Sequence, residues 1–335
     1  MMESANILLT GKQRVELCRQ PIPEVPADGL LARTQVSLIS TGTECICYHG
    51  NHEPGSHWAN WVSKYPFNLG YSNVARVEKI GADVEGYEVG DRIFTTSNHH
   101  QWIAVKTPVV KIPDAISDEE AAWSKLAAIS QTGVRRAQLQ MGAKVAIIGL
   151  GPLGQLLNQY SRLMGAEEVL AIDPVEGRLE IARAHGATQC FNGSAADAVQ
   201  FVESHTNGNL ADVVFDATGH YAVFPLALKL TRSFGTLMLI GDSPQPGKQV
   251  LQSDVITRQI TIRGTHNERL PPDQGEWSFH NQVRLFHTYV ARKQMRVGDL
   301  ITSRHSPAEA AAVYAGLLED RSATIGVVFD WSEVE

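Results

Sequence analysis

The sequence predicts an α/β protein in which a doubly wound parallel sheet is inserted into a β-rich unit. Two observations lead to this fold class. From Glu120 to about Thr265, short apolar runs alternate with helix-like stretches long enough for crossover helices, which is the βαβ rhythm of a parallel sheet. Before Glu120, short runs are instead broken by turn signals such as Ala27-Asp-Gly and Gly81-Ala-Asp, which are typical of a compact all-β unit.

The expected elements follow one another along the chain. Six apolar runs are expected to form the parallel sheet: residues 145–148, 169–172, 189–191, 212–217, 236–240 and 259–262. The rest of the chain is expected to contain amphipathic helices and one strand: residues 281–293, 307–320 and 326–330. This tail can add its strand and helices to the β-rich unit, which would then be discontinuous in sequence.

Three glycines between the first apolar run and the next helix form the most specific motif. Gly149, Gly151 and Gly154 have the spacing Gly-x-Gly-x-x-Gly. The first glycine allows a tight turn, the second lets the backbone approach a pyrophosphate, and the third lets the helix pack closely on the strand. The positive helix N-terminus, with Leu153 in its first turn, then attracts the phosphates. A bound dinucleotide is therefore expected here.

The acidic residue that closes the second run indicates which dinucleotide is bound. Asp173 ends the run that follows the glycine motif. A carboxylate at this place accepts hydrogen bonds from the adenosine ribose hydroxyls and repels a 2′-phosphate, which favours NAD over NADP. The alternative is that Asp173 only caps the helix that begins near Pro174. Arg178 could flank the ribose or a phosphate, or it could lie on a solvated helix face.

Composition excludes several classes of protein. Of the residues, 43% are apolar and 19% are charged, which is typical of globular proteins. The net charge of −7 and the isoelectric point near 6.0 come without a basic stripe, so neither nucleic acid nor an anionic membrane is expected as a main partner. Four irregularly spaced cysteines do not form a disulfide framework, and no signal peptide is recognisable. A cytoplasmic protein with a small-molecule substrate is expected.

Several motifs resemble the medium-chain dehydrogenase/reductase superfamily over essentially the full length. They occur in the order that this superfamily shows: Val89-Gly-Asp-Arg-Ile, Lys111-Ile-Pro-Asp, Ala127-Ala-Ile-Ser-Gln-Thr-Gly, the glycine motif and Ile301-Thr-Ser-Arg. The resemblance implies a GroES-like catalytic domain over residues 1–122, completed by residues 267–335. It implies a Rossmann NAD-binding domain over residues 123–266, and a homodimer formed through the edge of the Rossmann sheet near Ile260.

The sequence departs from the zinc-dependent members of this superfamily at every expected ligand. Those members surround a catalytic zinc with Cys, His and Cys, because the ion needs three protein ligands and an open position. The matching stretches here contain Thr41, Tyr71 and Ala127-Ala128. The lobe that binds a structural zinc with four cysteines is replaced by a short stretch around His99. We therefore expect no metal.

Without zinc, organic side chains must manage the proton of a reacting alcohol. Tyr71 could donate to the developing oxyanion through its phenol, although it could also be a bulky filler. Thr43 matches a hydroxyl that often begins a proton relay in relatives. His99 has a ring suited to proton transfer near neutral pH, although loop histidines often lie on the surface. These three residues are the catalytic candidates.

Further residues are expected to bind the cofactor at the carboxyl edge of the sheet, where open α/β sheets bind ligands. They follow the fourth and fifth runs: Thr218, Gly219 and Gly241. Thr132 would approach the nicotinamide, or it could cap or pack within its helix. Trp58, Trp61 and Thr41 are expected to line the substrate pocket, although barrel packing also explains such aromatic residues.

The sequence thus predicts an NAD-dependent, zinc-independent oxidoreductase that moves a hydride between nicotinamide and a secondary alcohol or ketone of a polar or carbocyclic metabolite. The stretch Ser37-Leu-Ile-Ser-Thr-Gly-Thr-Glu resembles the zinc-free branch that includes bacteriochlorophyllide-type dehydrogenases. Two alternatives are an NADPH-dependent quinone or enone reductase and a catalytically inactive NAD-binding protein. The branch is chemically heterogeneous, so the resemblance does not identify a substrate.

Overall fold

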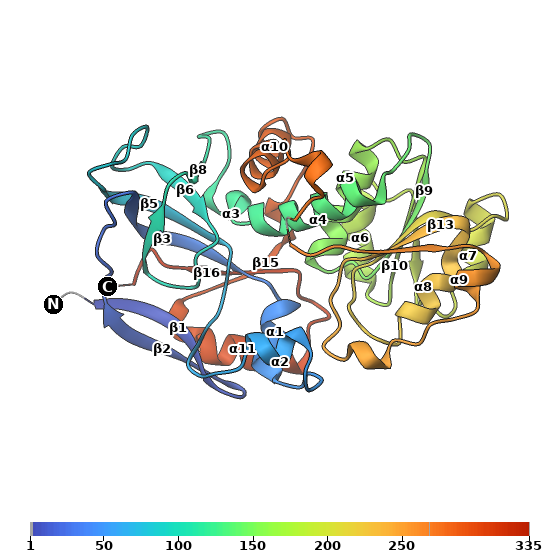
Figure 1. Cartoon of the computed structure of the whole chain (residues 1–335), viewed down its shortest axis with the longest axis horizontal. Helices are drawn as coiled ribbons and strands as arrows, with labels where there is room; N and C mark the ends of the chain where they lie inside the picture. The colour runs from blue at the N-terminus through green and yellow to red at the C-terminus, as the bar shows by residue number, and fades with distance from the viewer. Residues whose placement is uncertain (1–2, 268, 335) are drawn as a thin grey trace. The chain divides into compact units, whose positions relative to one another are not determined.

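The computed structural model describes residues 3–267 and 269–334, whose contacts divide the chain into two compact units (Figure 1). The first unit runs to Gly50, resumes over Trp61–Leu126 and resumes again from Phe279. The second unit contains Asn51–Asn60 and Ala127–Ser278. The domain boundaries expected near residues 122 and 266 stay predictions.

The second unit is built on a six-stranded parallel sheet. Its strands in spatial order are β11 (Gln189–Asn192), β10 (Glu168–Asp173), β9 (Lys144–Ile148), β12 (Ala211–Asp216), β13 (Thr231–Leu239) and β14 (Thr261–Gly264). The chain moves outward from β9 in one direction and then, from β12 on, in the other, which makes a topological switch point between these two strands. This arrangement confirms the predicted doubly wound sheet.

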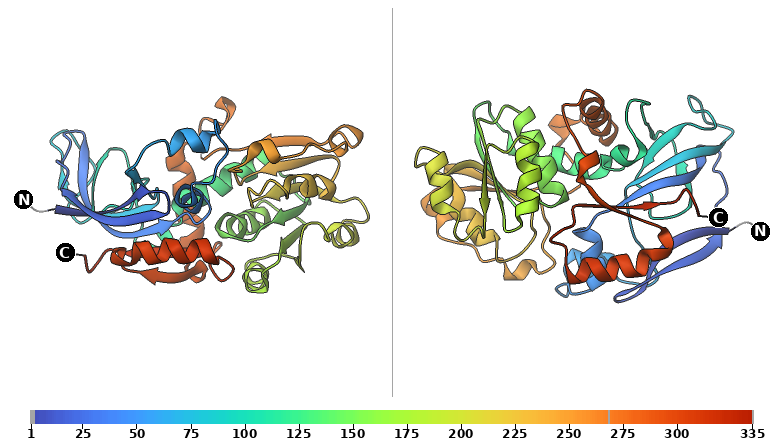
Figure 2. Two further views of the ribbon diagram at one scale, coloured as in Figure 1. Left: turned by 90° about the horizontal axis from the view of Figure 1, so that it is seen from below. Right: turned by 180° about the vertical axis from the view of Figure 1, so that it is seen from behind.

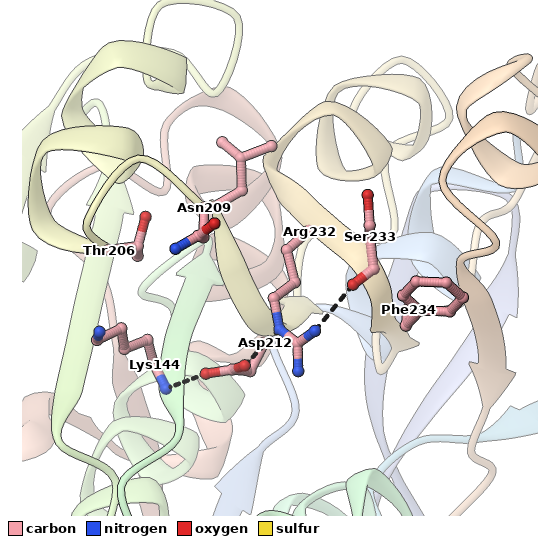
Figure 3. Close-up of a pocket in the computed structure, with 8 residues that line it drawn as sticks. Lys144, Thr206, Asn209, Asp212, Arg232, Ser233 and Phe234 are labelled. Carbon is pink, nitrogen blue, oxygen red and sulfur yellow. Dashed lines mark hydrogen bonds and ion pairs between the residues drawn. The ribbon is translucent and has the colours of Figure 1, made fainter.

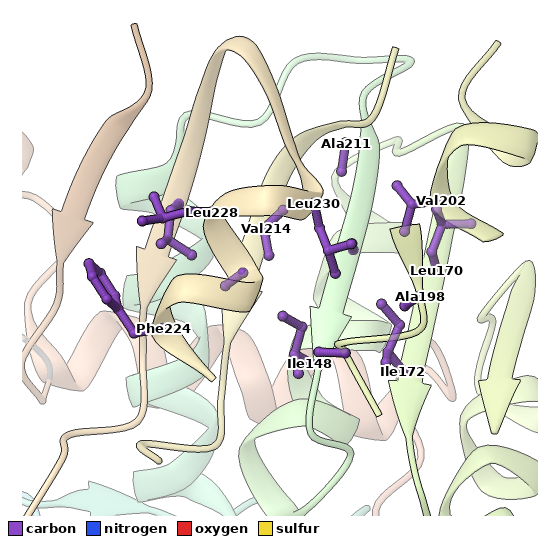
Figure 4. Close-up of a cluster of buried hydrophobic side chains, with 14 of the residues drawn as sticks. Ile148, Leu170, Ile172, Ala198, Val202, Ala211, Val214, Phe224, Leu228 and Leu230 are labelled. Atoms are coloured by element: carbon purple, nitrogen blue, oxygen red, sulfur yellow. The ribbon is translucent and has the colours of Figure 1, made fainter. Parts of the chain in front are cut away.

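Helices connect the strands of this sheet. They are α4 (Ser124–Ala137), which begins within the first unit, α5 (Pro152–Leu163), α6 (Glu176–Ala184), α7 (Val199–His205), α8 (Phe224–Leu230) and α9 (Asp254–Thr257). Alternate residues of the central strands, among them Ile148 and Ile172, face α7 and α8 in one apolar cluster (Figure 4). Residues of the opposite parity, such as Ile147 and Ala171, are also fully buried. Burial on both faces explains why these strands read as continuous apolar runs.

The last strand of the sheet begins later than expected. β14 starts at Thr261, whereas the predicted run started at Gln259. Gln259 has φ +52°, a left-handed conformation, and it follows the last turn of α9. The left-handed conformation at Gln259 ends the helical turn of α9, so the extended conformation of β14 begins only after it.

The first unit contains two sheets. The larger is antiparallel except for its first pair, in the order β15 (Ile301–His305), β16 (Gly326–Asp330), β3 (Gly29–Ile39), β5 (Asn73–Ile80), β6 (Arg92–Thr95) and β8 (Val110–Lys111), and β7 (Trp102–Lys106) also pairs with β3. The smaller is β2 (Arg14–Pro21), β1 (Glu3–Gly11) and β4 (Phe67–Asn68). Apolar residues of β3, β5, β6 and β7 pack together in one buried cluster of the first unit.

Helices of the first unit include segments from both ends of the chain. They are α1 (Thr43–His49), α3 (Asp118–Ala121), α10 (Phe279–Ala291) and α11 (Ala310–Glu319), and α2 (His57–Trp61) lies at the boundary between the units. Short 3₁₀ turns occur in this unit at Gly298–Leu300 and Pro307–Glu309, and in the second unit at Pro246–Lys248 and Pro272–Gln274. The views in Figure 2 show α11 beside the β1–β2 hairpin, where it packs on β2. The strand expected at residues 326–330 forms as β16 and pairs with β3, so the C-terminal segment returns to the N-terminal unit.

Two simple expectations can be compared with the described residues. The four cysteines are free thiols. Among the helices that the structure describes, none combines the length and the apolar character that a bilayer crossing would need.

Candidate functional site

The loop after β9 has the geometry that a dinucleotide-binding turn requires. Gly149 has φ +88°, a conformation that residues with a side chain rarely adopt. A Cβ on Gly154 would lie 2.0 Å from the carbonyl oxygen of Gly149, so only glycine lets α5 approach the loop this closely. A Cβ on Gly151 would meet nothing within 4 Å, which leaves open space beside the backbone. The three glycines therefore fit a pyrophosphate at the N-terminus of α5.

Asp173 joins the glycine loop to the turn before α6. Its buried carboxylate accepts hydrogen bonds from the backbone N–H of Leu150 at 2.7 Å and from that of Val175 at 2.9 Å. Arg178 Nη1 lies 3.7 Å from the same carboxylate. This place is compatible both with a structural role and with ribose binding. The cofactor roles of Asp173 and Arg178 stay predictions.

The carboxyl ends of β12 and β13 lie close together. Gly219 has φ +64°, and a Cβ on Gly241 would lie 2.3 Å from the backbone nitrogen of Gly219. The Thr218 hydroxyl donates to the Asp216 carboxylate at 2.6 Å and so closes its own loop. A cofactor at this edge would contact the backbone of these residues rather than their side chains.

Two other cofactor candidates lie on helices. Thr132 is fully buried, and its hydroxyl donates to the carbonyl oxygen of Ala128 at 2.9 Å, one turn earlier in α4. This bond is the packing alternative considered for Thr132. Leu153 is partly buried in the first turn of α5, and its carbonyl oxygen accepts from the Ser130 hydroxyl at 3.4 Å. A cofactor contact of either residue stays a prediction.

A segment that no sequence motif marks lies against the carboxyl edge of the sheet. The backbone N–H of Glu53 donates to the Pro244 carbonyl at 2.8 Å, and the Glu53 carboxylate accepts from the Gly247 N–H at 2.8 Å. His57 Nδ1 lies 2.9 Å from the Asp242 carboxylate, and burial raises the pKa of Asp242. Residues far apart in the sequence meet here, which explains why periodicity and spacing did not reveal the contact.

The three residues expected to line a substrate pocket differ in exposure. Trp58 and Thr41 are 4% and 5% exposed, whereas Trp61 is 45% exposed. The Thr41 carbonyl accepts from Arg321 at 3.0 Å. The Trp61 ring packs edge to face on Phe67, with centroids 5.4 Å apart. Trp58 and Thr41 are thus buried side chains. A substrate contact of any of the three residues stays a prediction.

Three hydroxyl groups meet at the start of α1 in the first unit. The Tyr71 hydroxyl forms hydrogen bonds with Ser40 Oγ and with Thr43 Oγ1, the latter at 3.1 Å. Burial raises the pKa of Tyr71, so its phenol is protonated at neutral pH. Ser40 is buried and Thr43 is partly exposed. We call these residues the hydroxyl cluster. It contains two of the catalytic candidates and adds Ser40, which the sequence motifs did not single out.

The third candidate, His99, is fully buried beside this cluster. Its Nε2 lies 3.0 Å from the Glu44 carboxylate and its Nδ1 lies 2.8 Å from the Ser37 hydroxyl. His99 is therefore not the surface histidine considered as the alternative. A direct role in proton transfer stays a prediction.

Glu44 carries the buried carboxylate at the centre of this region. It accepts hydrogen bonds from the Ser40 backbone N–H at 2.7 Å, from His99 at 3.0 Å and from the Tyr314 hydroxyl at 2.5 Å. Tyr314 belongs to α11, close to the other end of the chain. No sequence signal pointed to Tyr314, because nothing local indicates which helix will cover α1.

The residues at the expected ligand positions do not fit a zinc ion. Thr41, Tyr71 and Ala127-Ala128 offer neither a thiolate nor an imidazole, the groups that zinc prefers. Across the part of the chain that the structure describes, no group of three or more His, Cys, Asp and Glu side chains could hold a metal ion. Cys45 lies nearby in α1, but burial raises its pKa to about 11, which disfavours the thiolate.

A separate hollow lies at the amino edge of the parallel sheet (Figure 3). It measures about 400 Å³, and its lining includes Lys144, Asp212 and Arg232. Arg232 Nε donates to the Asp212 carboxylate at 2.5 Å, and the backbone N–H of Lys144 donates to it at 2.7 Å. Lys144 begins β9 and the glycine loop follows its end, so this hollow is not the expected dinucleotide site.

Comparisons with known proteins match part of this chain to a family model and find dehydrogenases among its relatives. Residues 152–278 match the family model described as "Zinc-binding dehydrogenase". Sorbitol dehydrogenase of Bacillus subtilis (strain 168) is 27% identical over 268 residues, which cover 70% of this chain and 74% of that protein. L-threonine 3-dehydrogenase of Caldanaerobacter subterraneus is 26% identical over 289 residues, which cover 77% of this chain and 82% of that protein.

Solved structures share the fold over nearly the whole chain. A protein from Sinorhizobium meliloti 1021, solved bound to NADP, has a TM-score of 0.82 at 20% identity and covers 98% of this chain and 100% of its own. An alcohol dehydrogenase from Escherichia coli CFT073, complexed with NADH, has a TM-score of 0.81 at 18% identity and covers 98% and 99%. At these identities the likeness establishes the architecture alone.

Proposed function

We propose that this chain is a medium-chain, zinc-type alcohol dehydrogenase, as its match to the family model and its relatives support, and that it oxidises a secondary alcohol with NAD and without zinc. Its relatives are named for sorbitol and L-threonine, which are small polar molecules with secondary hydroxyls. The proposed substrate is therefore a polyol or a similar polar metabolite. The observation that carries the proposal is the hydroxyl cluster, which stands where a metal ligand is expected.

NAD, when bound, supplies the acceptor for the hydride of the carbinol carbon. The residues of the chain must then manage the hydroxyl proton. As the substrate hydroxyl gives its proton to Tyr71 Oη, Tyr71 gives its own proton to Thr43, which is partly exposed and can pass a proton to water. Ser40 Oγ holds the phenol in place through its hydrogen bond. In ketone reduction the same protons move in the opposite direction.

NAD is proposed over NADP because a carboxylate at the end of β10 repels a 2′-phosphate. Asp173 supplies this carboxylate and is held in place by two backbone N–H groups. One observation favours the second candidate, an NADPH-dependent quinone or enone reductase. Arg178 lies 3.7 Å from Asp173 and would attract a 2′-phosphate. Relative affinity for the two cofactors decides between these candidates.

The experiment uses purified protein treated with a chelator. Sorbitol and L-threonine are each tested with NAD and NADP, and turnover is followed by nicotinamide absorbance. We expect NAD-linked turnover that survives chelation and that falls by about 10²-fold or more in Tyr71→Phe. Tighter binding of NADPH than of NADH, zinc whose removal abolishes turnover, or near-normal turnover of Tyr71→Phe would each contradict the proposal.

We also propose a homodimer and a cytoplasmic location. β14 is an edge strand of the parallel sheet, so a second copy could extend the sheet there. Free thiols are typical of a reducing compartment. Sedimentation of the purified protein tests the dimer, and a monomer at micromolar concentration would contradict it.

A further inference from the structure

A buried hydrogen-bond network lies directly behind the hydroxyl cluster. We call it the Glu44 network, and its members are Ser37, Glu44, His99, Tyr314 and Trp331. Each is at most 2% exposed. They come from β3, α1, the loop after β6, α11 and the residue after β16. Since water cannot replace lost bonds at such burial, donors and acceptors must match one another.

One donor of fixed direction is the starting point for assigning the hydrogen bonds of this network. Trp331 Nε1 can only donate, and it donates to Ser37 Oγ at 2.9 Å. We assign the hydroxyl hydrogen of Ser37 to His99 Nδ1, 2.8 Å away, so that this nitrogen is the acceptor. His99 Nε2 consequently carries the ring hydrogen and donates to Glu44 at 3.0 Å. In this assignment His99 accepts at Nδ1 and donates from Nε2.

Glu44 supplies the negative charge of the network. Its carboxylate faces three donors, from Ser40, His99 and Tyr314. Burial and the charge of Glu44 raise the pKa of Tyr314 well above its usual value, so Tyr314 remains a phenol and donates. Hydrogen bonds to a carboxylate are stronger than neutral ones, so these three donors are held firmly.

The network reaches both sides of the hydroxyl cluster. Glu44 holds the backbone N–H of Ser40, whose side chain in turn meets Tyr71. The ring of His99 lies against Gly70, which directly precedes Tyr71, and a Cβ on Gly70 would lie 2.6 Å from this ring. The backbone N–H of His99 also donates to the Leu69 carbonyl at 2.9 Å. One buried network therefore fixes both partners of the Tyr71 hydrogen bond.

We propose that Glu44, His99 and Tyr314 are positioning residues for the proton transfer at Tyr71. They hold Ser40 on one side and the backbone leading into Tyr71 on the other. The inference rests on the proposed function for the role of Tyr71. In this role the fully buried ring of His99 needs no contact with substrate. Through Tyr314, α11 also supports a site whose reacting groups, Tyr71 and Thr43, belong to the first 71 residues.

Tyr314→Phe tests this role because it removes one hydroxyl and keeps the ring. Tyr48→Phe is the matched control, since Tyr48 lies on α1 with its ring 5.8 Å from that of Tyr314 and contributes no hydrogen bond to the Glu44 network. We expect Tyr314→Phe to lower kcat about tenfold, because small misplacements of reacting groups cost this much or more. Its Kd for NADH should stay unchanged, and kcat of Tyr48→Phe should stay within twofold of the wild-type value.

A double variant separates this inference from the proposed function. If Tyr314 acts through Tyr71, Tyr314→Phe lowers kcat in the wild-type background and has no further effect in Tyr71→Phe. An equal loss in both backgrounds, or an equal loss in Tyr48→Phe, would overturn the positioning role while leaving the proposed function intact. Normal turnover of Tyr71→Phe alone would refute the proposed function and the inference with it.

A second readout needs no substrate. Nitrogen-15 NMR of labelled histidine distinguishes the two neutral tautomers and the imidazolium, and the His99 signals are assigned by their loss in His99→Gln. From the assigned hydrogen bonds, we expect Nε2 to carry the ring hydrogen and Nδ1 to carry none. Observation of the Nδ1-protonated form or of the imidazolium would overturn the hydrogen-bond direction on which the inference depends.

Discussion

The glycine loop of the second unit and the Glu44 network of the first unit are built in opposite ways. The loop uses backbone groups from one short stretch, in which Gly149, Gly151 and Gly154 contribute by lacking a side chain. The network uses five side chains from separate parts of the first unit, which are joined by hydrogen bonds. From this difference we expect that added side-chain atoms disturb the loop, whereas lost hydrogen bonds disturb the network.

The largest effect is expected where an atom is added to the loop. Gly154→Ala would place a Cβ 2.0 Å from the Gly149 carbonyl oxygen, so α5 must move away from the loop. We expect NADH affinity, measured by fluorescence titration, to fall by more than about 100-fold. Gly177→Ala in α6 is the control, because its Cβ would meet nothing within 4 Å. The control should bind NADH normally and gain about 0.5–1 kcal/mol of stability. Normal NADH binding by Gly154→Ala would break the comparison.

A lost charge in the network should have the next largest effect. Glu44→Gln keeps the size of the side chain but turns an amide N–H₂ group toward groups that are themselves donors. We expect the free energy of unfolding in urea to fall by about 3 kcal/mol. Glu180→Gln on an exposed position of α6 is the control and should change it by less than about 0.5 kcal/mol. Similar values for both variants would show that the network adds no stability.

A second buried imidazole in the first unit predicts a pH dependence. His287 Nε2 lies 2.8 Å from the Ser124 hydroxyl, and burial lowers the pKa of His287 to about 4. An unfolded histidine has a pKa near 6.5, so between these values the unfolded chain binds a proton that the folded chain does not. The contribution of His287 should lower the free energy of unfolding by about 2 kcal/mol when the pH falls from 7 to 5. His287→Gln should reduce this dependence, and an unchanged slope would refute the assignment.

The smallest predicted effect concerns cofactor preference. Asp173→Ser removes the charge that opposes a 2′-phosphate but keeps a short acceptor beside the backbone N–H groups of the loop. We expect the ratio of the NADPH and NADH dissociation constants to shift about tenfold toward NADPH, which corresponds to about 1.4 kcal/mol. Asp197→Ser, at an exposed position of the same unit, should leave the ratio unchanged. An unchanged ratio in Asp173→Ser would show that Asp173 acts only within the loop.

The features that could be predicted from the sequence are those whose cause is local. The parallel sheet was predictable because its central strands β9, β10 and β12 are short buried runs, and the glycine loop because its backbone conformation requires glycine at fixed spacing. The start of β14 was missed because Gln259 adopts a left-handed conformation without being glycine. Tyr314 could not be found, since its partner Glu44 is 270 residues away and only the packing of α11 brings them together. The catalytic and cofactor roles stay predictions.

The pairing of β16 with β3 has a consequence for how the protein is made. During translation, β3 and Glu44 leave the ribosome well before β16, Trp331 and the Tyr314 donor, which lie 270 or more residues further along the chain. The second unit has all the strands of its parallel sheet available before β16 is made and can fold first. The early part of the first unit must therefore wait, with β3 lacking its β16 partner and Glu44 lacking one donor, until β16 and α11 have been synthesised.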